Sequence, residues 1–243
     1  MTKRNVLNDL RVFKGRGFYK RFKDIYARLP VTKCDGCGIC CSDPPKITYP
    51  EFLYIFNYFE ENFNSSQKIS FYRYAIKECF YDLVMKRSPC VFLDDSNKCL
   101  IYPVSPISCK RWGTQSENIN NKDWESDLKQ GKDYQKHYKK LGIIIPDEVV
   151  FNRTPFCNKV KIISNPYKFN IDDYDNIYKE ILDIIAFYGD RNNPSYNLPS
   201  YLIELINGKP MYSERIEMIK KYQNGDKEAI ENYANNISLE NVI

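Results

Sequence analysis

Four of the nine cysteines lie within eight residues, in the run Lys-Cys-Asp-Gly-Cys-Gly-Ile-Cys-Cys-Ser. Neither packing nor turn formation requires thiols at this density. Thiolates two residues apart on a loop that contains glycine can surround one metal ion or one cluster. The sequence therefore predicts a metal centre that uses Cys34, Cys37, Cys40 and Cys41.

The spacing in this run is closer to that of an iron–sulfur site than to that of a structural zinc site. Cys34, Cys37 and Cys40 match the first three ligands of a ferredoxin-type run, whereas Cys41 departs from the fourth position. Structural zinc usually takes two well-separated C-x2-C pairs. The other candidate ligands are single cysteines: Cys90, Cys99, Cys109 and Cys157. We therefore favour an iron–sulfur cluster and keep zinc, in a purely stabilising role, as the alternative.

Cys40 and Cys41 are adjacent, which bears on how they can bind metal. Neighbouring side chains on an extended backbone point to opposite sides, so we do not expect this pair to bind one ion together. Either the loop contributes to two adjacent sites, or one thiol of the pair is not a direct ligand. Gly36 and Gly38 suit a tight loop with positive φ whose amides point at sulfur.

Helices are predicted on both sides of the cysteine run. Apolar residues recur at helical spacing, between basic ones, over residues 18–29. Thr48 and Glu51 form a capping box, which predicts a helix over about residues 49–63. A further helix is predicted over residues 69–86. Its apolar stripe contains Cys79, which we interpret as a small core residue rather than a ligand.

The later cysteines follow a turn and a bend. Two short apolar runs around an Asp/Ser/Asn turn predict a β-hairpin over residues 90–103. Within it, we interpret Asp94 and Asp95 as turn formers rather than as paired catalytic carboxylates. We expect a polar stretch over about residues 113–135 and then a helix around His137, the only histidine, which should face solvent. Beyond Cys157 the chain is predicted to be wholly helical, with helices at residues 173–188, 199–207, 213–223 and 227–235.

These elements predict an α+β, mainly helical fold. In it, a small irregular cysteine-rich core with a short hairpin is surrounded by helices. Three regions are expected: a basic amphipathic helix within residues 1–30, a metal-binding domain over 31–160, and a helical extension over 161–243.

Composition and charge narrow the class of protein. No apolar run approaches the ~18 residues of a membrane span, and no secretory signal is evident, so we expect a cytoplasmic protein. Reduced thiols in that compartment indicate metal binding rather than disulfides. Residues 1–30 carry nine Lys/Arg against two Asp, which leaves residues 31–243 with about −2 of the overall +5. Nucleic-acid binding through this basic region is not expected, because no aromatic-rich binding sheet accompanies it.

Taken together, these spacings resemble those of the YkgJ-type cysteine-cluster family. The resemblance rests on Cys34-x2-Cys37-Gly38-x-Cys40-Cys41, Ile47-Thr48-x2-Glu51, Cys90-x-Phe92-Leu93, Cys99-x-Ile101-Tyr102-Pro103 and Pro106-x2-Cys109, over about residues 34–113. The family is named for a proposed zinc- or iron-chelating domain, and some relatives are called flagellin lysine N-methylases. The resemblance implies that its cysteine positions fall on the seven cysteines named from Cys34 to Cys109, with Cys157 as a less secure eighth.

The chain departs from the family pattern at three positions. Ser105 stands where the family usually has arginine before the proline, and Lys110 stands where it has arginine after the last cysteine. Gly113 replaces a common proline. Lysine cannot reproduce the bidentate fork of an arginine, so a guanidinium that holds an anion beside the metal is not expected at Lys110.

Two functions from different classes remain open at this point, beside a third in which the basic N-terminal helix binds nucleic acid or a partner and zinc only stabilises the fold. One is a metal-binding protein with a redox or structural centre. The other, implied only by the resemblance, is a methyltransferase that uses S-adenosylmethionine to modify lysines of a protein substrate. The chain lacks a strand–G-x-G–helix nucleotide fingerprint, which speaks against the second unless the centre itself binds the cofactor.

Overall fold

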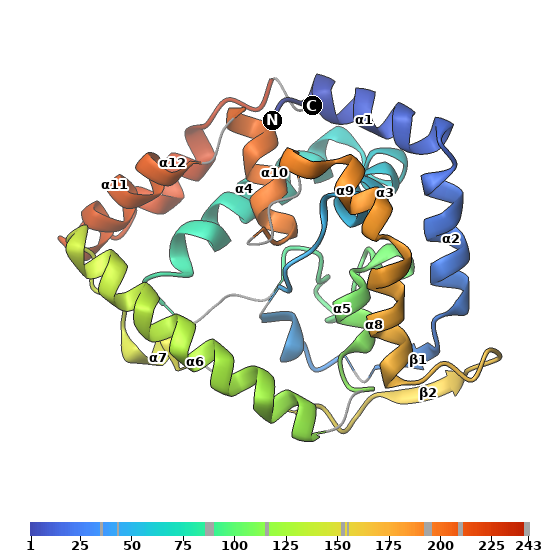
Figure 1. Ribbon diagram of the computed structural model, residues 1–243. Coiled ribbons are helices and arrows are strands. Elements are labelled where there is room, and N and C mark those ends of the chain that lie inside the picture. The colour runs from blue at the N-terminus through green and yellow to red at the C-terminus, as the bar shows by residue number, and fades with distance from the viewer. Residues whose placement is uncertain are drawn as a thin grey trace.

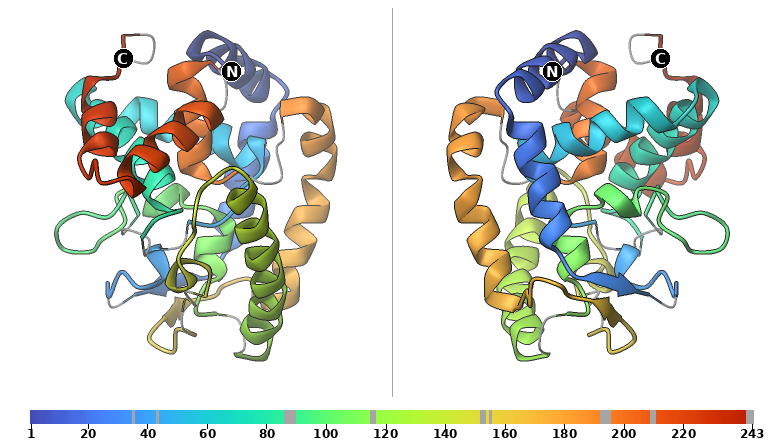
Figure 2. Two further views of the ribbon diagram at one scale, coloured as in Figure 1. Left: turned by 90° about the vertical axis from the view of Figure 1, so that its left-hand side faces the viewer. Right: turned by 90° about the vertical axis from the view of Figure 1, so that its right-hand side faces the viewer.

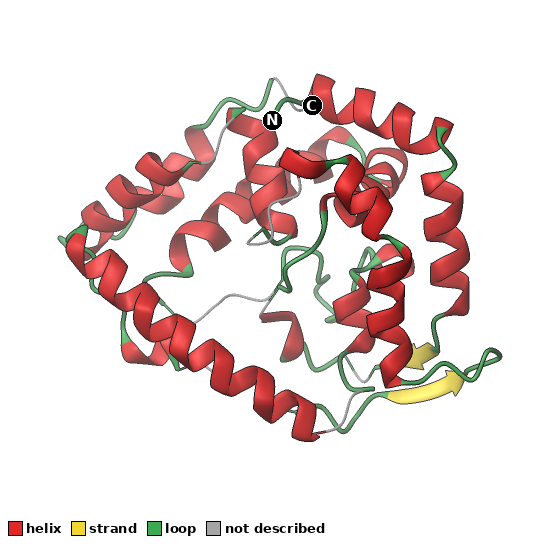
Figure 3. Cartoon of the chain, viewed as in Figure 1, coloured by secondary structure: helices red, strands yellow, loops and turns green. Residues whose placement is uncertain are grey.

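The computed structural model describes residues 1–34, 36–42, 44–85, 90–114, 117–151, 154, 156–191, 196–208 and 211–240. The fold is α+β and mainly helical, as predicted, with a two-stranded antiparallel sheet (Figures 1 and 3). In chain order the elements are α1 (Lys3–Gly15), α2 (Phe18–Arg28), β1 (Val31–Lys33), α3 (Tyr49–Asn62), α4 (Ser65–Tyr81), α5 (Ile107–Arg111), α6 (Glu117–Lys140), α7 (Asp147–Val150), β2 (Lys161–Ser164), α8 (Ile171–Glu180), α9 (Leu182–Phe187), α10 (Leu198–Asn207), α11 (Tyr212–Gln223) and α12 (Ala229–Asn236).

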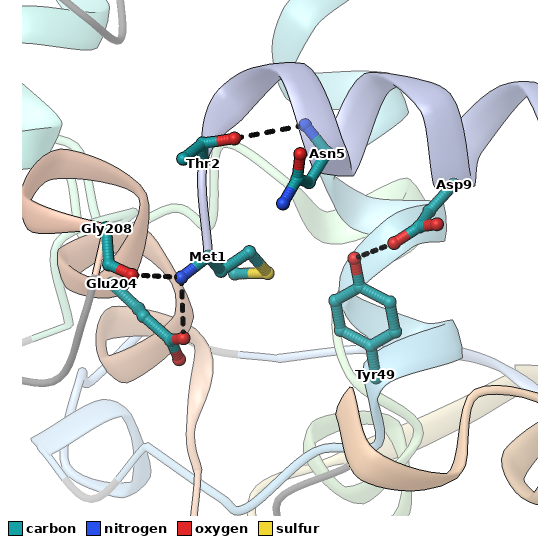
Figure 4. Close-up of polar contacts among 7 residues, drawn as sticks. All are labelled: Met1, Thr2, Asn5, Asp9, Tyr49, Glu204 and Gly208. Atoms are coloured by element: carbon teal, nitrogen blue, oxygen red, sulfur yellow. Dashed lines mark hydrogen bonds and ion pairs between the residues drawn. The ribbon is translucent and has the colours of Figure 1, made fainter.

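The N-terminal region forms two helices where the sequence predicted one. Thr2 caps α1, because its hydroxyl oxygen accepts a hydrogen bond from the Asn5 amide at 3.3 Å (Figure 4). Gly17, at φ 77°, separates α1 from α2. The interior side of α1 is held by the Tyr49 hydroxyl, which donates to Asp9 Oδ2 at 2.8 Å (Figure 4). The buried side chains of α1 are spaced as in an amphipathic helix, so this helix could have been predicted.

The predicted helix over residues 18–29 is confirmed as α2, and it packs on the core. Phe22 and Ile25 are buried. α2 lies beside α8 and α9 (Figure 2), to which Arg21–Asp183 and Arg28–Glu180 ion pairs join it at 2.8 and 2.5 Å. Part of its basic face therefore serves to pair with neighbouring acidic residues.

Helices α3 and α4 form the centre of the molecule. The predicted capping box of α3 is present, with Thr48 and Glu51 bonded reciprocally. α4 begins at Ser65, four residues earlier than predicted, because Asn64 and Gln67 form a second capping box. It ends at Tyr81, and the predicted end at Lys86 lies outside the described residues. Helices α10, α11 and α12 pack against α4.

Several predicted elements were wrong in type or extent. The hairpin over residues 90–103 is reduced to one bridge, between Leu93 and Cys99, and the two-stranded sheet is formed instead by β1 and β2. The region after Cys157 is thus not wholly helical. The polar stretch over residues 113–135 forms most of α6, and the predicted helix over 173–188 is divided at Ile181 into α8 and α9.

One hydrophobic cluster runs through residues from Val6 to Leu239 and includes side chains of all three predicted regions. A smaller cluster joins α6 to α11 through Tyr138, Ile143 and Ile219. The division of the chain at residues 30 and 160 stays a prediction.

Within the described residues, no helix has the length and apolar character needed to cross a membrane.

Candidate metal centre

The cysteine loop is shaped by its two glycines. Gly36 and Gly38 both have φ of 70°, a backbone conformation that favours glycine. The Gly36 amide donates a hydrogen bond to Cys34 Sγ at 3.3 Å. A side chain at Gly38 would place its Cβ 3.3 Å from Asn97 Oδ1, so the loop approaches the 94–98 turn closely. The predicted tight loop with positive φ is confirmed.

Asp94 builds the turn against which this loop packs. Its Oδ1 accepts hydrogen bonds from the amides of Ser96 at 2.9 Å and Lys98 at 2.8 Å, and from the Ser96 hydroxyl at 2.7 Å. The bonds from Lys98 and Ser96 lower the pKa of the Asp94 carboxyl. Asp94 is therefore a turn former, as predicted.

Thiols from three separate segments lie within electrostatic range of one another. The pKa of Cys109 is raised chiefly by desolvation among surrounding protein atoms, although the residue keeps an exposed surface, and then by Cys99, Cys40 and Glu51. The pKa of Cys90 is raised by burial, by Glu78, and by Cys109 and Cys99. Cys40, Cys90, Cys99 and Cys109 thus gather in one region although they are up to 69 residues apart in sequence.

The adjacent thiols Cys40 and Cys41 do not diverge as predicted. Residues Cys40–Ser42 form a 3-10 turn rather than extended backbone. The two side chains are hydrogen-bonded, and this bond is the largest cause of the raised pKa of Cys40, followed by burial. The expectation that they point to opposite sides was wrong, because it assumed a strand-like backbone.

Glu51 connects the centre of the fold to the segment that carries Cys109. This carboxylate is fully buried, and one oxygen accepts from the Thr48 amide at 3.0 Å. The other accepts from the amide of Ile107, the first residue of α5, at 3.3 Å. Burial raises the pKa of Glu51, and the hydrogen bonds from Thr48 and Ile107 oppose that rise. The family-like Thr48-x2-Glu51 motif therefore has a second task, which is to position α5.

Lys110 supplies positive charge beside the thiols. Its ammonium donates to the Tyr102 carbonyl at 2.8 Å and lies 4.5 Å from the centre of the Tyr102 ring. Burial lowers the pKa of Lys110 to about 8, while Cys99 and Cys109 act in the opposite direction. A protonated Lys110 would stabilise thiolates, although as a point charge and not as a fork.

The other two departures from the family pattern also have structural reasons. Ser105 is buried, its hydroxyl donates to the Tyr102 carbonyl at 3.1 Å, and its carbonyl accepts from the Tyr26 hydroxyl at 3.0 Å, so an arginine there would have to bury its charge or displace these contacts. Gly113 has φ of 79°, which a proline cannot adopt. A side chain there would also place its Cβ 2.5 Å from Val160 Cγ2.

The remaining candidate ligands are Cys34, Cys37 and Cys157. Cys34 and Cys37 are exposed on the loop, and the Cys157 carbonyl lies beside Gly113, after α5. All nine cysteines are free thiols. Among the described residues, no three His, Cys, Asp or Glu side chains are grouped closely enough to hold a metal ion. The donor chemistry suits a thiophilic metal, but the thiols would have to draw together to bind it.

Two residues that the sequence analysis set aside lie where it predicted. His137 is exposed, with Nε2 2.9 Å from the Tyr212 hydroxyl oxygen. Cys79 packs against the main hydrophobic cluster, and burial raises its pKa to about 11. Glu78, which lies on α4 one turn before its C-cap Asp82, was not predicted as part of the site. Its buried Oε2 has no hydrogen-bond partner among the described residues, and its place in an apolar helix face was the only available signal.

Comparison with protein families adds to this geometry. Residues 33–129 match the family model CxxCxxCC, described as a "putative zinc- or iron-chelating domain". The resemblance seen in the sequence is thereby confirmed over this range. The matched range contains every candidate cysteine except Cys157, and it ends within α6. No curated protein and no solved structure gives a significant match to the chain.

Proposed function

We propose that this chain is a metal-binding protein whose cysteine thiolates hold an iron–sulfur cluster, in a redox or structural role. The observation that carries the proposal is that Cys40 and Cys99 lie near enough to Cys109 to raise its pKa, with Lys110 beside them. With Cys41 and Cys90 this region offers five thiols, which is enough for the four cysteine ligands of an iron–sulfur cluster. A bound cluster would supply one-electron chemistry at this place.

Binding would change the thiols and the loop in defined ways. Thiols must lose their protons to bind a metal. In the metal-free chain the pKa of Cys90 and Cys99 is raised chiefly by burial, and that of Cys40 by its hydrogen bond to Cys41 and then by burial. Metal binding therefore releases protons from these thiols. Because the thiols are not pre-assembled, the cysteine loop would close onto the segment from Cys90 to Cys109. The positive charge of Lys110 would offset part of the resulting negative charge.

The test is metal and acid-labile sulfide analysis of protein purified without oxygen, with an absorption spectrum of the same sample. Iron with matching sulfide and a broad visible absorption band would support the proposal. Zinc without colour would replace the cluster by a structural zinc site. Protein free of both metals after reconstitution would contradict metal binding itself. The methyltransferase function rests on the family resemblance alone and stays a prediction, as does the cytoplasmic location.

A further inference from the structure

The two-stranded sheet lies at the periphery of the molecule and is almost entirely exposed (Figures 1 and 2). β1 pairs with β2 in antiparallel register, with Lys33 opposite Lys161. All four residues of β2 are exposed, among them Ile162 at 52% and Ile163 at 63%. Val31 on β1 is 53% exposed, and Tyr167, three residues after β2 in the sequence, is 62% exposed. Exposed apolar side chains on both faces of a short strand are suited to contact with a partner.

The two edges of the sheet differ. Tyr102 covers β1, because its hydroxyl donates to the Thr32 carbonyl at 2.8 Å and lies 2.7 Å from Thr32 Oγ1. Among the described residues, no further strand pairs with β2, and no backbone hydrogen bond outside the sheet involves residues 161–164. The outer edge of β2 thus presents amide and carbonyl groups that an added strand could pair with.

The charge around this edge indicates what would pair with it. Lys33, Lys159, Lys161 and Lys168 are all exposed, and no ion pair in the described part of the chain joins any of them to an acidic side chain. A second copy of the chain would bring two such lysine groups together across the new strand pair, which like-charge repulsion opposes. An acidic chain would be attracted instead.

We propose that the outer edge of β2 binds an extended acidic segment of a partner protein by β-strand addition. Main-chain hydrogen bonds to residues 161–164 would hold the segment, its acidic side chains would meet the four lysines, and apolar side chains would cover Ile162 and Ile163. β1 leads directly into Cys34, so a bound segment would lie close to the cysteine loop. The inference does not depend on which metal the thiols bind.

The test uses full-length protein purified without oxygen and a displayed library of random peptides of about ten residues, long enough to pair along β2. We expect enriched peptides to alternate acidic with β-branched or aromatic residues. A selected peptide should protect the amides of residues 161–164 from hydrogen exchange. The double variant I162E/I163E should bind it at least about tenfold more weakly, or about 1.4 kcal/mol. The matched control is Ile144→Glu, which changes an isoleucine that is 73% exposed elsewhere on the surface.

A second pair of variants separates charge from strand pairing. K161E/K168E should weaken peptide binding, whereas K139E/K140E, at exposed lysines of α6, should not. Three outcomes would overturn the proposal. One is that the wild type and I162E/I163E enrich the same peptides from the library. Another is self-association of the protein that I162E/I163E abolishes. The last is equal binding of a random single-stranded oligonucleotide, which would show a merely electrostatic surface.

Discussion

Glu51 links helix α3 to the segment that carries Cys109, and its removal should destabilise the protein in a way that can be localised. Glu51→Ala leaves the buried Ile107 amide and the partly buried Thr48 amide without their acceptor. Each unsatisfied amide costs about 1–3 kcal/mol. Burial raises the pKa of Glu51, so burying the charged carboxylate costs free energy, and Glu51→Ala removes this cost. We therefore expect a net loss of about 2–4 kcal/mol in the free energy of unfolding.

Urea unfolding followed by circular dichroism measures this loss, and hydrogen exchange localises it. The Ile107 amide should exchange faster in Glu51→Ala, because its acceptor is gone. The matched control is Glu61→Ala on the same helix, at an exposed side chain 3.5 Å from Lys14, which should cost less than about 1 kcal/mol. If alanine prevents folding, Glu51→Gln keeps one acceptor and should show about half the loss. A cost for Glu51→Ala equal to that of the control, with unchanged exchange at Ile107, would refute the role assigned to Glu51.

Two further substitutions test the surroundings of the thiols. Burial, and then the charge of Asp82, raises the pKa of Glu78 from 4.5 to about 8. Between these two pH values the native state binds more protons than the unfolded chain, so the free energy of unfolding should fall as pH rises from 4.5 to 8. Glu78→Gln should lessen that fall, as urea unfolding at pH 5 and pH 8 would show, and equal slopes for both proteins would contradict it. Gly38→Ala should cost about 1–2 kcal/mol, because φ there is 70°. The same change at Gly15, whose added Cβ would contact nothing within 4 Å, should be neutral or stabilising in the same assay.

Helices with strong local signals could be predicted from the sequence. Thr48 and Glu51 predicted the start of α3, and Gly208, at φ 71°, ends α10 where expected. α6 was expected only near His137, because its N-terminal half is polar and offers no apolar periodicity to read. β2 was missed because a strand exposed on both faces shows no alternation of apolar and polar residues.

The candidate site could be predicted in composition but not in arrangement. Thiol density in the run from Cys34 to Cys41 indicated metal binding, and the match of residues 33–129 to the CxxCxxCC family model agrees with it. The proximity of Cys40, Cys99 and Cys109 depends on how the loop packs against the turn at Asn97. The hydrogen bond from Ile107 to Glu51 likewise joins positions that no local pattern connects.

The central claim is that Cys109 and the loop cysteines serve one metal centre. The most direct measurement is the metal and sulfide content of Cys109→Ser beside that of Cys79→Ala, both purified without oxygen. Cys79 is the matched control, since it is a free thiol that packs in the hydrophobic core. The account predicts that Cys109→Ser loses most of its metal while Cys79→Ala retains the wild-type content. Full metal content in Cys109→Ser would contradict it.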